Sequence, residues 1–172
     1  MNLAEAIAYI FPAYVANGAP VVFVRALGRS HPIDLGARAW DGRRVLGDGK
    51  TFEGLLSGIL SGFMVGLIIL FMGNLGGFRS PLEPLVLSLG AMCGDILGAF
   101  LKRRMGIERG RPAPILDQLG FLAVALASAY VVYGPPRWLD GYTLAAIILI
   151  TVALHLSTNA GAYLLGLKDR PY

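Results

Sequence analysis

The chain has very little of the chemistry that builds common metal or redox centres. Among its 172 residues there is one cysteine, Cys93, and there are two histidines, His31 and His155. A single cysteine excludes an intramolecular disulfide and a cysteine-based zinc site. The two histidines lie far apart in the sequence, so they form no local metal-binding pair.

Charge is also scarce. Charged residues make up 15% of the chain, whereas soluble domains contain about 25%. Hydrophobic residues make up 55%, and the mean hydropathy is +0.62. A chain of this size leaves too much surface exposed to hide so many apolar side chains from water. The composition therefore excludes an ordinary soluble domain and a disordered chain, and it indicates a polytopic membrane protein.

Five stretches are long and apolar enough to cross a bilayer, which takes roughly 20 residues. They cover approximately residues 3–24, 52–72, 84–101, 116–133 and 143–165. We expect an all-α protein whose residues 1–172 form one membrane-embedded domain. Pro12 and Pro20 are expected to break or kink the first helix. The longer loops then cover about 25–51 and 102–115.

The few positive charges are concentrated on one side of these spans. Arg79 and Arg137 lie on the side of the N-terminus, and the other thirteen lysines and arginines lie in the two longer loops and the C-terminal tail. Cytoplasmic loops carry an excess of such residues. The pattern predicts an outer N-terminus, a cytoplasmic C-terminus and a site that meets soluble substrates at the cytoplasmic face of the cell membrane.

Glycines recur every four residues in the second and third spans. This spacing places small residues on one helix face and lets helix backbones approach closely. The pattern predicts tight helix packing and by itself indicates no activity. The glycines concerned are Gly54, Gly58, Gly62, Gly66, Gly90, Gly94 and Gly98.

The first long loop ends in a glycine-rich turn, Gly47-Asp48-Gly49-Lys50-Thr51, just before a membrane helix. The turn resembles a phosphate-binding loop but does not complete that pattern, because Arg44 stands where its first glycine belongs. Free N–H groups at a helix N-terminus still favour an anion, and Lys50 adds a positive charge. The alternative is a simple helix cap at Thr51 with a lysine that extends to the membrane surface.

Two acids lie at the cytoplasmic ends of adjacent spans. Asp95 is inside the third span, where an acid is costly and is usually functional. Lys102 is seven residues further on, so it shares a helix face with Asp95. Asp117 begins the fourth span. Mg²⁺ prefers one or two carboxylates together with phosphate oxygens, so these acids could hold Mg²⁺ and a polyphosphate. A structural ion pair for Asp95 and a loop that only touches lipid headgroups are the alternatives.

Other polar residues lie within the apolar stretches. Asn17 is in the first span, and His155 and Asn159 are one helical turn apart in the fifth. They could be hydrogen-bonding contacts between helices. A polar wall for a nucleobase or a lipid phosphate is the alternative.

Taken together, these segments resemble the archaeal CDP-archaeol synthase family, which is related to the CDP-diacylglycerol synthases. The resemblance covers nearly the whole chain. It is carried by Asn17-Gly-Ala-Pro20, Leu46-Gly-Asp-Gly-Lys-Thr-Phe-Glu-Gly54, Gly94-Asp95, Lys102-Arg103-Arg104, Pro112-Ala-Pro114-Ile-Leu-Asp117-Gln118-Leu and Asn159-x-x-Ala162-Tyr163.

The resemblance implies cytidylyl transfer from CTP to a geranylgeranyl-ether glycerol phosphate, with Mg²⁺ and release of pyrophosphate. Asp95 and Asp117 would be the Mg²⁺ or catalytic acids. Lys50, Thr51, Lys102 and Arg103 would hold the triphosphate, and Asn17 would belong to the same cavity. The implied partners are CTP, the ether lipid phosphate and the bilayer, with no nucleic acid; the oligomeric state is open.

The chain departs from its relatives' patterns at two places. Gly120 stands where the family often has an acid, which puts a second metal ligand on the fourth helix in doubt. Ala113 to Ile115 replace the His-Gly-Gly of the bacterial relatives. A transporter or channel, a CDP-alcohol phosphotransferase and a non-catalytic scaffold are the alternative functions.

Overall fold

The computed structural model describes residues 3–108, 110–113 and 115–167, and five α-helices form its frame. They are α1 (Leu3–Leu27), α2 (Phe52–Phe71), α3 (Glu83–Arg104), α4 (Leu116–Tyr133) and α5 (Gly141–Leu164). All five are long and apolar enough to cross a membrane. The described residues contain two isolated β-bridges and no strand. The prediction of an all-α protein with five membrane-spanning helices is confirmed.

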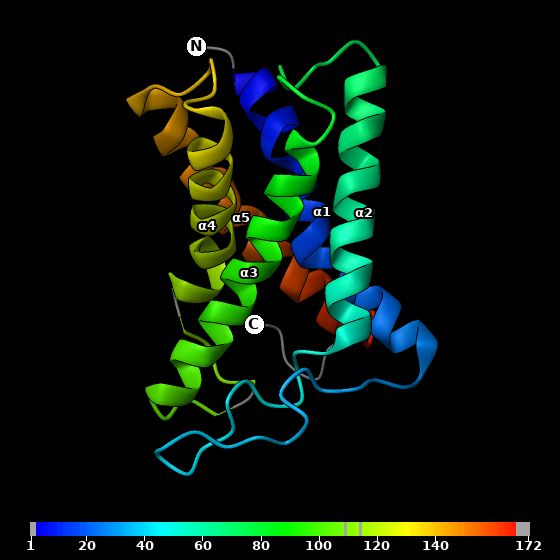
Figure 1. Ribbon diagram of the computed structural model, residues 1–172, viewed down its shortest axis with the longest axis vertical. Helices are drawn as coiled ribbons and strands as arrows, with labels where there is room; N and C mark the ends of the chain where they lie inside the picture. The colour runs from blue at the N-terminus through cyan, green and yellow to red at the C-terminus, as the bar shows by residue number, and fades with distance from the viewer. Residues whose placement is uncertain (1–2, 109, 114, 168–172) are drawn as a thin grey trace.

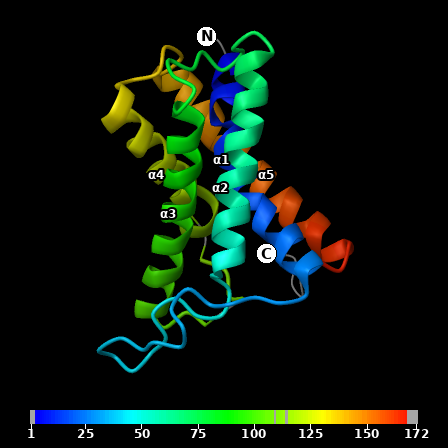
Figure 2. The same cartoon turned by 45° about the vertical axis from the view of Figure 1, so that its right-hand side comes forward.

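The helices form a bundle in which α1 contacts all four others and α3 is the most buried (Figure 1). Half of the most apolar stretch of α3 is buried, against 17 to 28% for the other four helices. α3 packs against α1, α2 and α4, while α5 contacts only α1 and α4 among the helices. Figure 2 shows that α5 leans away from α3 towards the far end of α1. One hydrogen-bonding contact, of 2.6 Å between the Tyr14 hydroxyl and Thr151 Oγ1, joins α5 to α1.

The loops divide between the two ends of the bundle. The start of α1 and the connections α2–α3 and α4–α5 lie at one end, drawn at the top of Figure 1. The loops 28–51 and 105–115, which carry six of the twelve arginines, lie together at the other end. We refer to this second end as the basic end. The uneven distribution of positive charge along the sequence therefore corresponds to the two opposite ends of the helix bundle.

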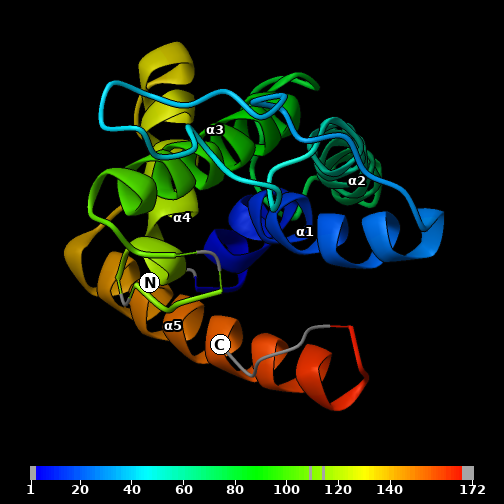
Figure 3. The same ribbon diagram turned by 90° about the horizontal axis from the view of Figure 1, so that it is seen from below.

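Two helix ends differ from the predicted spans in ways that matter for the site. α3 continues to Arg104, so Lys102 and Arg103 belong to its last turn and not to a loop. Positive side chains there are favoured by the helix dipole. α1 is unbroken across Pro12 and Pro20, and its last part turns away from the bundle (Figure 3). The expected break is absent, whereas the change of direction is present.

The glycine stripes pack the helices as the spacing predicts. A β-carbon at Gly62 in α2 would lie 2.5 Å from the Pro12 carbonyl oxygen of α1 and 2.5 Å from Ser88 Oγ of α3. A β-carbon at Gly94 in α3 would lie 2.7 Å from the Gly120 carbonyl oxygen of α4. At Gly98, by contrast, the nearest atom would be 3.7 Å away. The tight contact between α3 and α4 therefore opens at the basic end.

Gly62→Ala should lower the melting temperature of the protein in detergent. The added methyl group has to displace backbone of α1, and overpacking of this kind costs about 1–3 kcal/mol. Gly18→Ala is the matched control, because a β-carbon there meets no atom within 4 Å and Gly18 is helical. Alanine favours a helix over glycine, so the control should keep or raise the melting temperature. Equal melting temperatures for both variants would contradict the packing role of the stripe.

The opposite end of the bundle is closed by a polar cluster that the sequence did not suggest. Glu83 is completely buried and is paired with Arg79. The Tyr9 hydroxyl of α1 donates to Glu83 over 2.6 Å. Arg79 also donates to the carbonyl oxygens of Tyr133 and Gly134 at the end of α4. Three helices are thus joined at this end of the bundle.

Candidate active site

The first loop is held in shape by a buried acid, Asp34, which sequence reasoning missed. Its carboxylate accepts hydrogen bonds from the amides of Leu46 (2.9 Å) and Gly47 (2.8 Å) and pairs with the Arg44 guanidinium at 2.6 Å. The guanidinium and the amide donors hold the pKa of Asp34 well below its usual range. The sequence Asp34-Leu-Gly36 could have indicated this role, because it is typical of an Asx turn. In the structure the Asp34 carboxylate accepts a hydrogen bond from the Gly36 amide, as such a turn requires.

This arrangement presents Lys50 at the start of α2. The Lys50 carbonyl oxygen accepts from the Ile33 amide over 2.8 Å, which fixes the backbone of the loop. The next residue, Thr51, is the N-cap of α2, and its hydroxyl accepts from the Gly54 amide. Lys50 Nζ then reaches across to α3 and lies 2.6 Å from Asp95 Oδ2.

A second pair of opposite charge joins α3 to α4. Lys102 Nζ in the last turn of α3 donates to Asp117 Oδ1 over 2.8 Å. The other oxygen of Asp117 accepts from the Ala113 amide, also over 2.8 Å. The short segment before α4 thereby folds back onto the first turn of that helix. The Asp117 carboxylate is therefore held by the Ala113 amide, from the segment before α4, and by Lys102 of the neighbouring helix.

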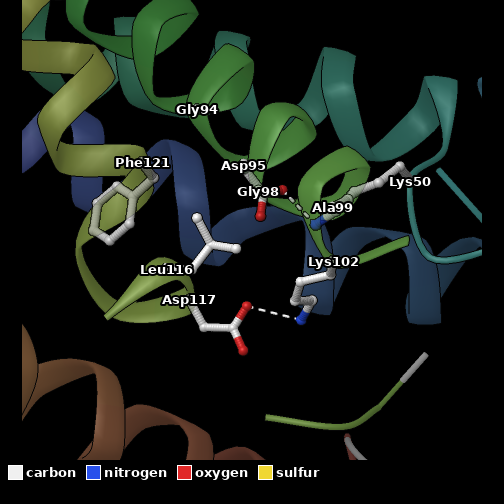
Figure 4. A pocket seen from close by; sticks show the side chains of 9 residues that line it. All are labelled: Lys50, Gly94, Asp95, Gly98, Ala99, Lys102, Leu116, Asp117 and Phe121. Atoms are coloured by element: carbon white, nitrogen blue, oxygen red, sulfur yellow. Dashed lines mark hydrogen bonds and ion pairs between the residues drawn. The ribbon is translucent and has the colours of Figure 1, made fainter. Parts of the chain in front are cut away.

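The two pairs line one cavity at the basic end (Figure 4). Its volume is about 40 Å³, and it lies where the α3–α4 packing opens at Gly98. Asp95 and Lys102 both face it, as their spacing on α3 predicts. Each acid is paired with a lysine from another element. The ion pair considered as the alternative role of Asp95 is therefore present, and its partner is Lys50. The lining residues are Lys50, Gly94, Asp95, Gly98, Ala99, Lys102, Leu116, Asp117 and Phe121.

The charged groups of this cavity are of the types that bind a phosphate and a hard cation. Two ammonium groups supply charge for an anion, and two carboxylates supply oxygen ligands. Within the described residues no group of three histidine, cysteine, aspartate or glutamate side chains gathers. Two carboxylates without such a cluster suit Mg²⁺, which keeps water and substrate phosphate oxygens in its remaining positions.

Comparisons with known proteins identify the family of the chain. The family model described as "CarS-like: CDP-archaeol synthase" matches residues 2–172. A CDP-archaeol synthase of Thermofilum pendens is 45% identical, over 99% of this chain and 82% of its own. One of Aeropyrum pernix is 46% identical, over 99% and 93%.

This chain belongs to the CDP-archaeol synthase family. A solved structure described as an intramembrane enzyme for archaeal membrane lipids biosynthesis is 39% identical and has a TM-score of 0.77. That likeness covers 90% of this chain and 92% of the other. The chain is therefore an enzyme of archaeal membrane lipid synthesis, and the transporter, phosphotransferase and scaffold alternatives lose their support.

Several residues to which the family resemblance assigns nucleotide binding lie beside the cavity and do not line it. Thr51 caps α2, and Asp48 pairs with Arg44 at 2.8 Å. The Gly47 amide donates to Asp34, so this N–H group of the turn does not face the cavity. Arg103 points towards the glycine turn, with Nη1 3.9 Å from the position of a Gly47 β-carbon. Gly49 is exposed in the turn itself.

The polar residues of α1 and α5 lie elsewhere. Asn17 is half-buried in α1, Asn159 is buried in α5, and His155 lies one turn before it. None of the three lines the cavity between α3 and α4. A role for them in the same site would require a ligand that extends from the cavity towards α1 and α5.

The Asp34 carboxylate should keep the loop ordered even in mild acid. Its pKa is lowered in the folded protein, so its stabilising contribution is present above the unfolded value of about 3.9 and is lost only as the pH falls through the lower folded pKa. We expect the amides of Leu46 and Gly47 to resist hydrogen exchange at pH 7 and at pH 4. Asp34→Asn should abolish that protection at both pH values, because each hydrogen bond to a charged group contributes about 1.5–3 kcal/mol.

Asp48→Asn is the control for this experiment. Asp48 also pairs with Arg44, but its side chain is 58% exposed and such surface pairs contribute little. Protection of the two amides should survive the change. Loss of protection in both variants, or in neither, would show that Asp34 does not organise the loop.

Proposed function

We propose that this chain transfers the cytidylyl group of CTP to 2,3-bis-O-geranylgeranyl-glycerol 1-phosphate. The products are CDP-archaeol with unsaturated chains and pyrophosphate. The observation that carries the proposal is the pair of acid–lysine contacts, Lys50–Asp95 and Lys102–Asp117, around one cavity at the basic end of a membrane bundle. The family assignment supplies the reaction class.

The reaction is an in-line displacement at phosphorus. An oxygen of the lipid phosphate forms a bond to the α-phosphorus of CTP, and the bond from that phosphorus to the β-phosphate oxygen breaks. The attacking phosphate is already ionised, so it needs little help from a general base. The enzyme mainly has to align the two phosphates and neutralise the charge that develops on the leaving pyrophosphate.

We assign these tasks to the residues of the cavity. Lys50 and Lys102 bind the triphosphate, and Asp95 and Asp117 hold Mg²⁺, with Lys102 also neutralising the leaving group. Bound Mg²⁺ would supply Lewis-acid stabilisation of phosphate oxygens. The free space between the charged groups is about 40 Å³, far below the roughly 300–1,000 Å³ of ligand pockets. The acid–lysine pairs would therefore separate to admit the triphosphate, while the nucleoside stays nearer the loops.

The other residues that the family resemblance assigns to the site form an outer layer of this proposed site. Arg103 and the turn Gly47-Asp48-Gly49 lie where the nucleotide would leave the cavity, and Thr51 fixes the turn to α2. Asn17, and more remotely His155 and Asn159, belong to the path that a lipid phosphate or a base would take past α1 and α5.

We further propose that the basic end faces the cytoplasm. Arginines and lysines gather there, whereas the opposite end carries Arg79 and Arg137. Cytoplasmic loops are enriched in these residues. The N-terminus would then lie outside and the C-terminus inside. CTP would enter the cavity from the cytoplasm, and the lipid would arrive through the inner leaflet of the cell membrane.

The proposal is tested with the purified protein in detergent. CTP, Mg²⁺ and the geranylgeranyl-ether glycerol phosphate should give pyrophosphate and a CDP-lipid of matching mass. ATP in place of CTP, or omission of the lipid, should give neither. No product with any lipid phosphate would overturn the proposed reaction. Undiminished turnover in EDTA would overturn only the part that concerns Mg²⁺.

A further inference from the structure

The first long loop contains a short hairpin that the proposed chemistry does not use. The Val45 amide donates to the Ala37 carbonyl oxygen over 3.0 Å, and the Ala39 amide donates to the Arg43 carbonyl oxygen over 2.9 Å. Gly42 closes the turn with φ +74°, a conformation that favours glycine. We refer to residues 37–45 as the basic hairpin. Trp40 lies at its tip.

The basic hairpin is fixed to the last turn of α3. Arg104 Nη1 lies 2.9 Å from Asp41 Oδ1, and Arg104 Nη2 donates to the Arg44 carbonyl oxygen over 2.6 Å. In return, Arg43 Nη1 donates to the Arg104 carbonyl oxygen over 3.0 Å. These contacts run in both directions between the two elements, so the tip cannot move freely relative to the bundle.

Trp40 is held on the outside of α3. Its ring centroid lies 6.3 Å from that of Phe100, and the Arg104 guanidinium lies 5.4 Å from the Trp40 ring centroid. Only the inner face of the indole is used by these contacts, because Trp40 remains 84% exposed. A large apolar ring in this rigid setting is unfavourable if its outer face meets only water.

The surface beside Trp40 is the apolar outer face of α3. The exposed residues of that face follow one another at intervals of four, and Phe100 and Arg104 continue the stripe to the end of the helix. Trp40 therefore extends a surface that the membrane covers. The exposed stripe consists of Leu89, Cys93, Leu97 and Leu101.

Positive charges flank the ring. Arg38 and Arg43 are exposed on the two sides of the turn. Arg38 Nη1 donates to the Gly42 carbonyl oxygen and Arg43 Nη1 to the Arg104 carbonyl oxygen, so each of these bonds uses one guanidinium nitrogen. An arginine has five N–H donors, so both side chains keep donors for an anion. An indole ring between guanidinium groups at the end of a membrane helix matches the headgroup region, where tryptophan rings and phosphates meet.

We propose that the basic hairpin anchors the enzyme in the leaflet at its basic end. The Trp40 ring enters that leaflet at the level of the headgroups, and Arg38 and Arg43 bind the phosphates of anionic lipids. The hairpin is continuous with the segment that Asp34 holds and is bonded to the helix that carries Asp95 and Lys102. Anchoring would therefore fix the cavity at a defined depth relative to a lipid phosphate.

The chain contains two tryptophans, which makes the depth of Trp40 measurable. Trp138→Phe leaves Trp40 as the only indole, and the protein is reconstituted into anionic phospholipid vesicles with bromine at different depths along the acyl chain. Bromine near the glycerol end should quench Trp40 more strongly than bromine near the chain terminus. The same quenching is obtained without altering Trp138, as the difference between the wild-type protein and Trp40→Phe.

The lipid charge separates a phosphate contact from simple apolar insertion. In Trp138→Phe, replacing the anionic vesicles by zwitterionic ones, or introducing Arg38→Gln together with Arg43→Gln, should weaken the quenching by shallow bromine. Equal quenching in all these cases would overturn the assignment of phosphate binding to the two arginines. Emission that ignores brominated lipid and is freely quenched by acrylamide would place Trp40 in water or against a soluble partner, and it would overturn the anchor. Neither readout depends on cytidylyl transfer.

Discussion

Asp95→Asn is expected to lower the rate of pyrophosphate release by about a hundredfold to a thousandfold, the loss typical of removing one charged group that stabilises a transition state. Asparagine keeps the size of the side chain but removes the charge that would hold Mg²⁺ and that now pairs with Lys50. The Asp95 side chain is 28% exposed, and asparagine can still accept a hydrogen bond from Lys50. The melting temperature should therefore stay close to that of the wild type.

Glu108→Gln is the matched control for Asp95→Asn. Glu108 also lies at the basic end, but it is exposed and its contact with Arg111 is a loose 3.6 Å. Its loss should leave turnover unchanged. Turnover of the wild-type order in Asp95→Asn would remove Asp95 from the proposed mechanism. A parallel loss of turnover and melting temperature would show that Asp95 serves the fold and not the reaction.

Helix periodicity is the part of this architecture that the sequence determines most directly. Apolar stretches of membrane length predict all five helices, and the spacing of Gly62 and Gly94 predicts which faces pack. The same periodicity places Asp95 and Lys102 on one face of α3. These predictions succeed because each depends on residues within a few turns of one helix. The prediction of a break or kink in α1 is met by a change of direction without a break (Figure 3), and at Pro12 the helix packs closely against Gly62 of α2.

The partners of the site residues could not be obtained in this way. Lys50 and Asp95 are 45 positions apart in sequence, and only the packing of the first loop on α3 brings them together. Asp34 was missed because most of its hydrogen-bond donors are backbone amides, which every residue type supplies. The sequence also does not predict the opening at Gly98, because Gly98 has the same four-residue spacing as the glycines that pack tightly.

The lysine contacts lead to a second large effect. Lys50 Nζ contacts one oxygen of Asp95, and Lys102 Nζ contacts one oxygen of Asp117. In the proposed mechanism each ammonium group therefore competes with Mg²⁺ for its acid. A triphosphate would draw both ammonium groups away from the acids. CTP and the metal ion should then bind with positive coupling, and each should raise the affinity for the other by the same factor.

Lys50→Met should change the affinities for CTP and for the metal ion in opposite directions. We expect CTP to bind about tenfold or more weakly, because a charge-assisted contact to phosphate is lost, at about 1.5–3 kcal/mol. Mn²⁺ alone, as a spectroscopic substitute for Mg²⁺, should bind more tightly because the competing ammonium group is gone. Calorimetry measures the first change and electron paramagnetic resonance of free Mn²⁺ measures the second.

Arg111→Met distinguishes this competition from a general loss of positive charge. Arg111 lies at the same end, is exposed and contacts Glu108 outside the cavity. Removing its charge makes the basic end more attractive to any cation by a small, salt-sensitive amount, since exposed charges are screened. Lys50→Met should exceed that effect and retain it at high ionic strength, because its competition takes place on the Asp95 oxygen itself. Equal effects of the two variants on Mn²⁺ binding would mean that Lys50 does not occupy the metal position.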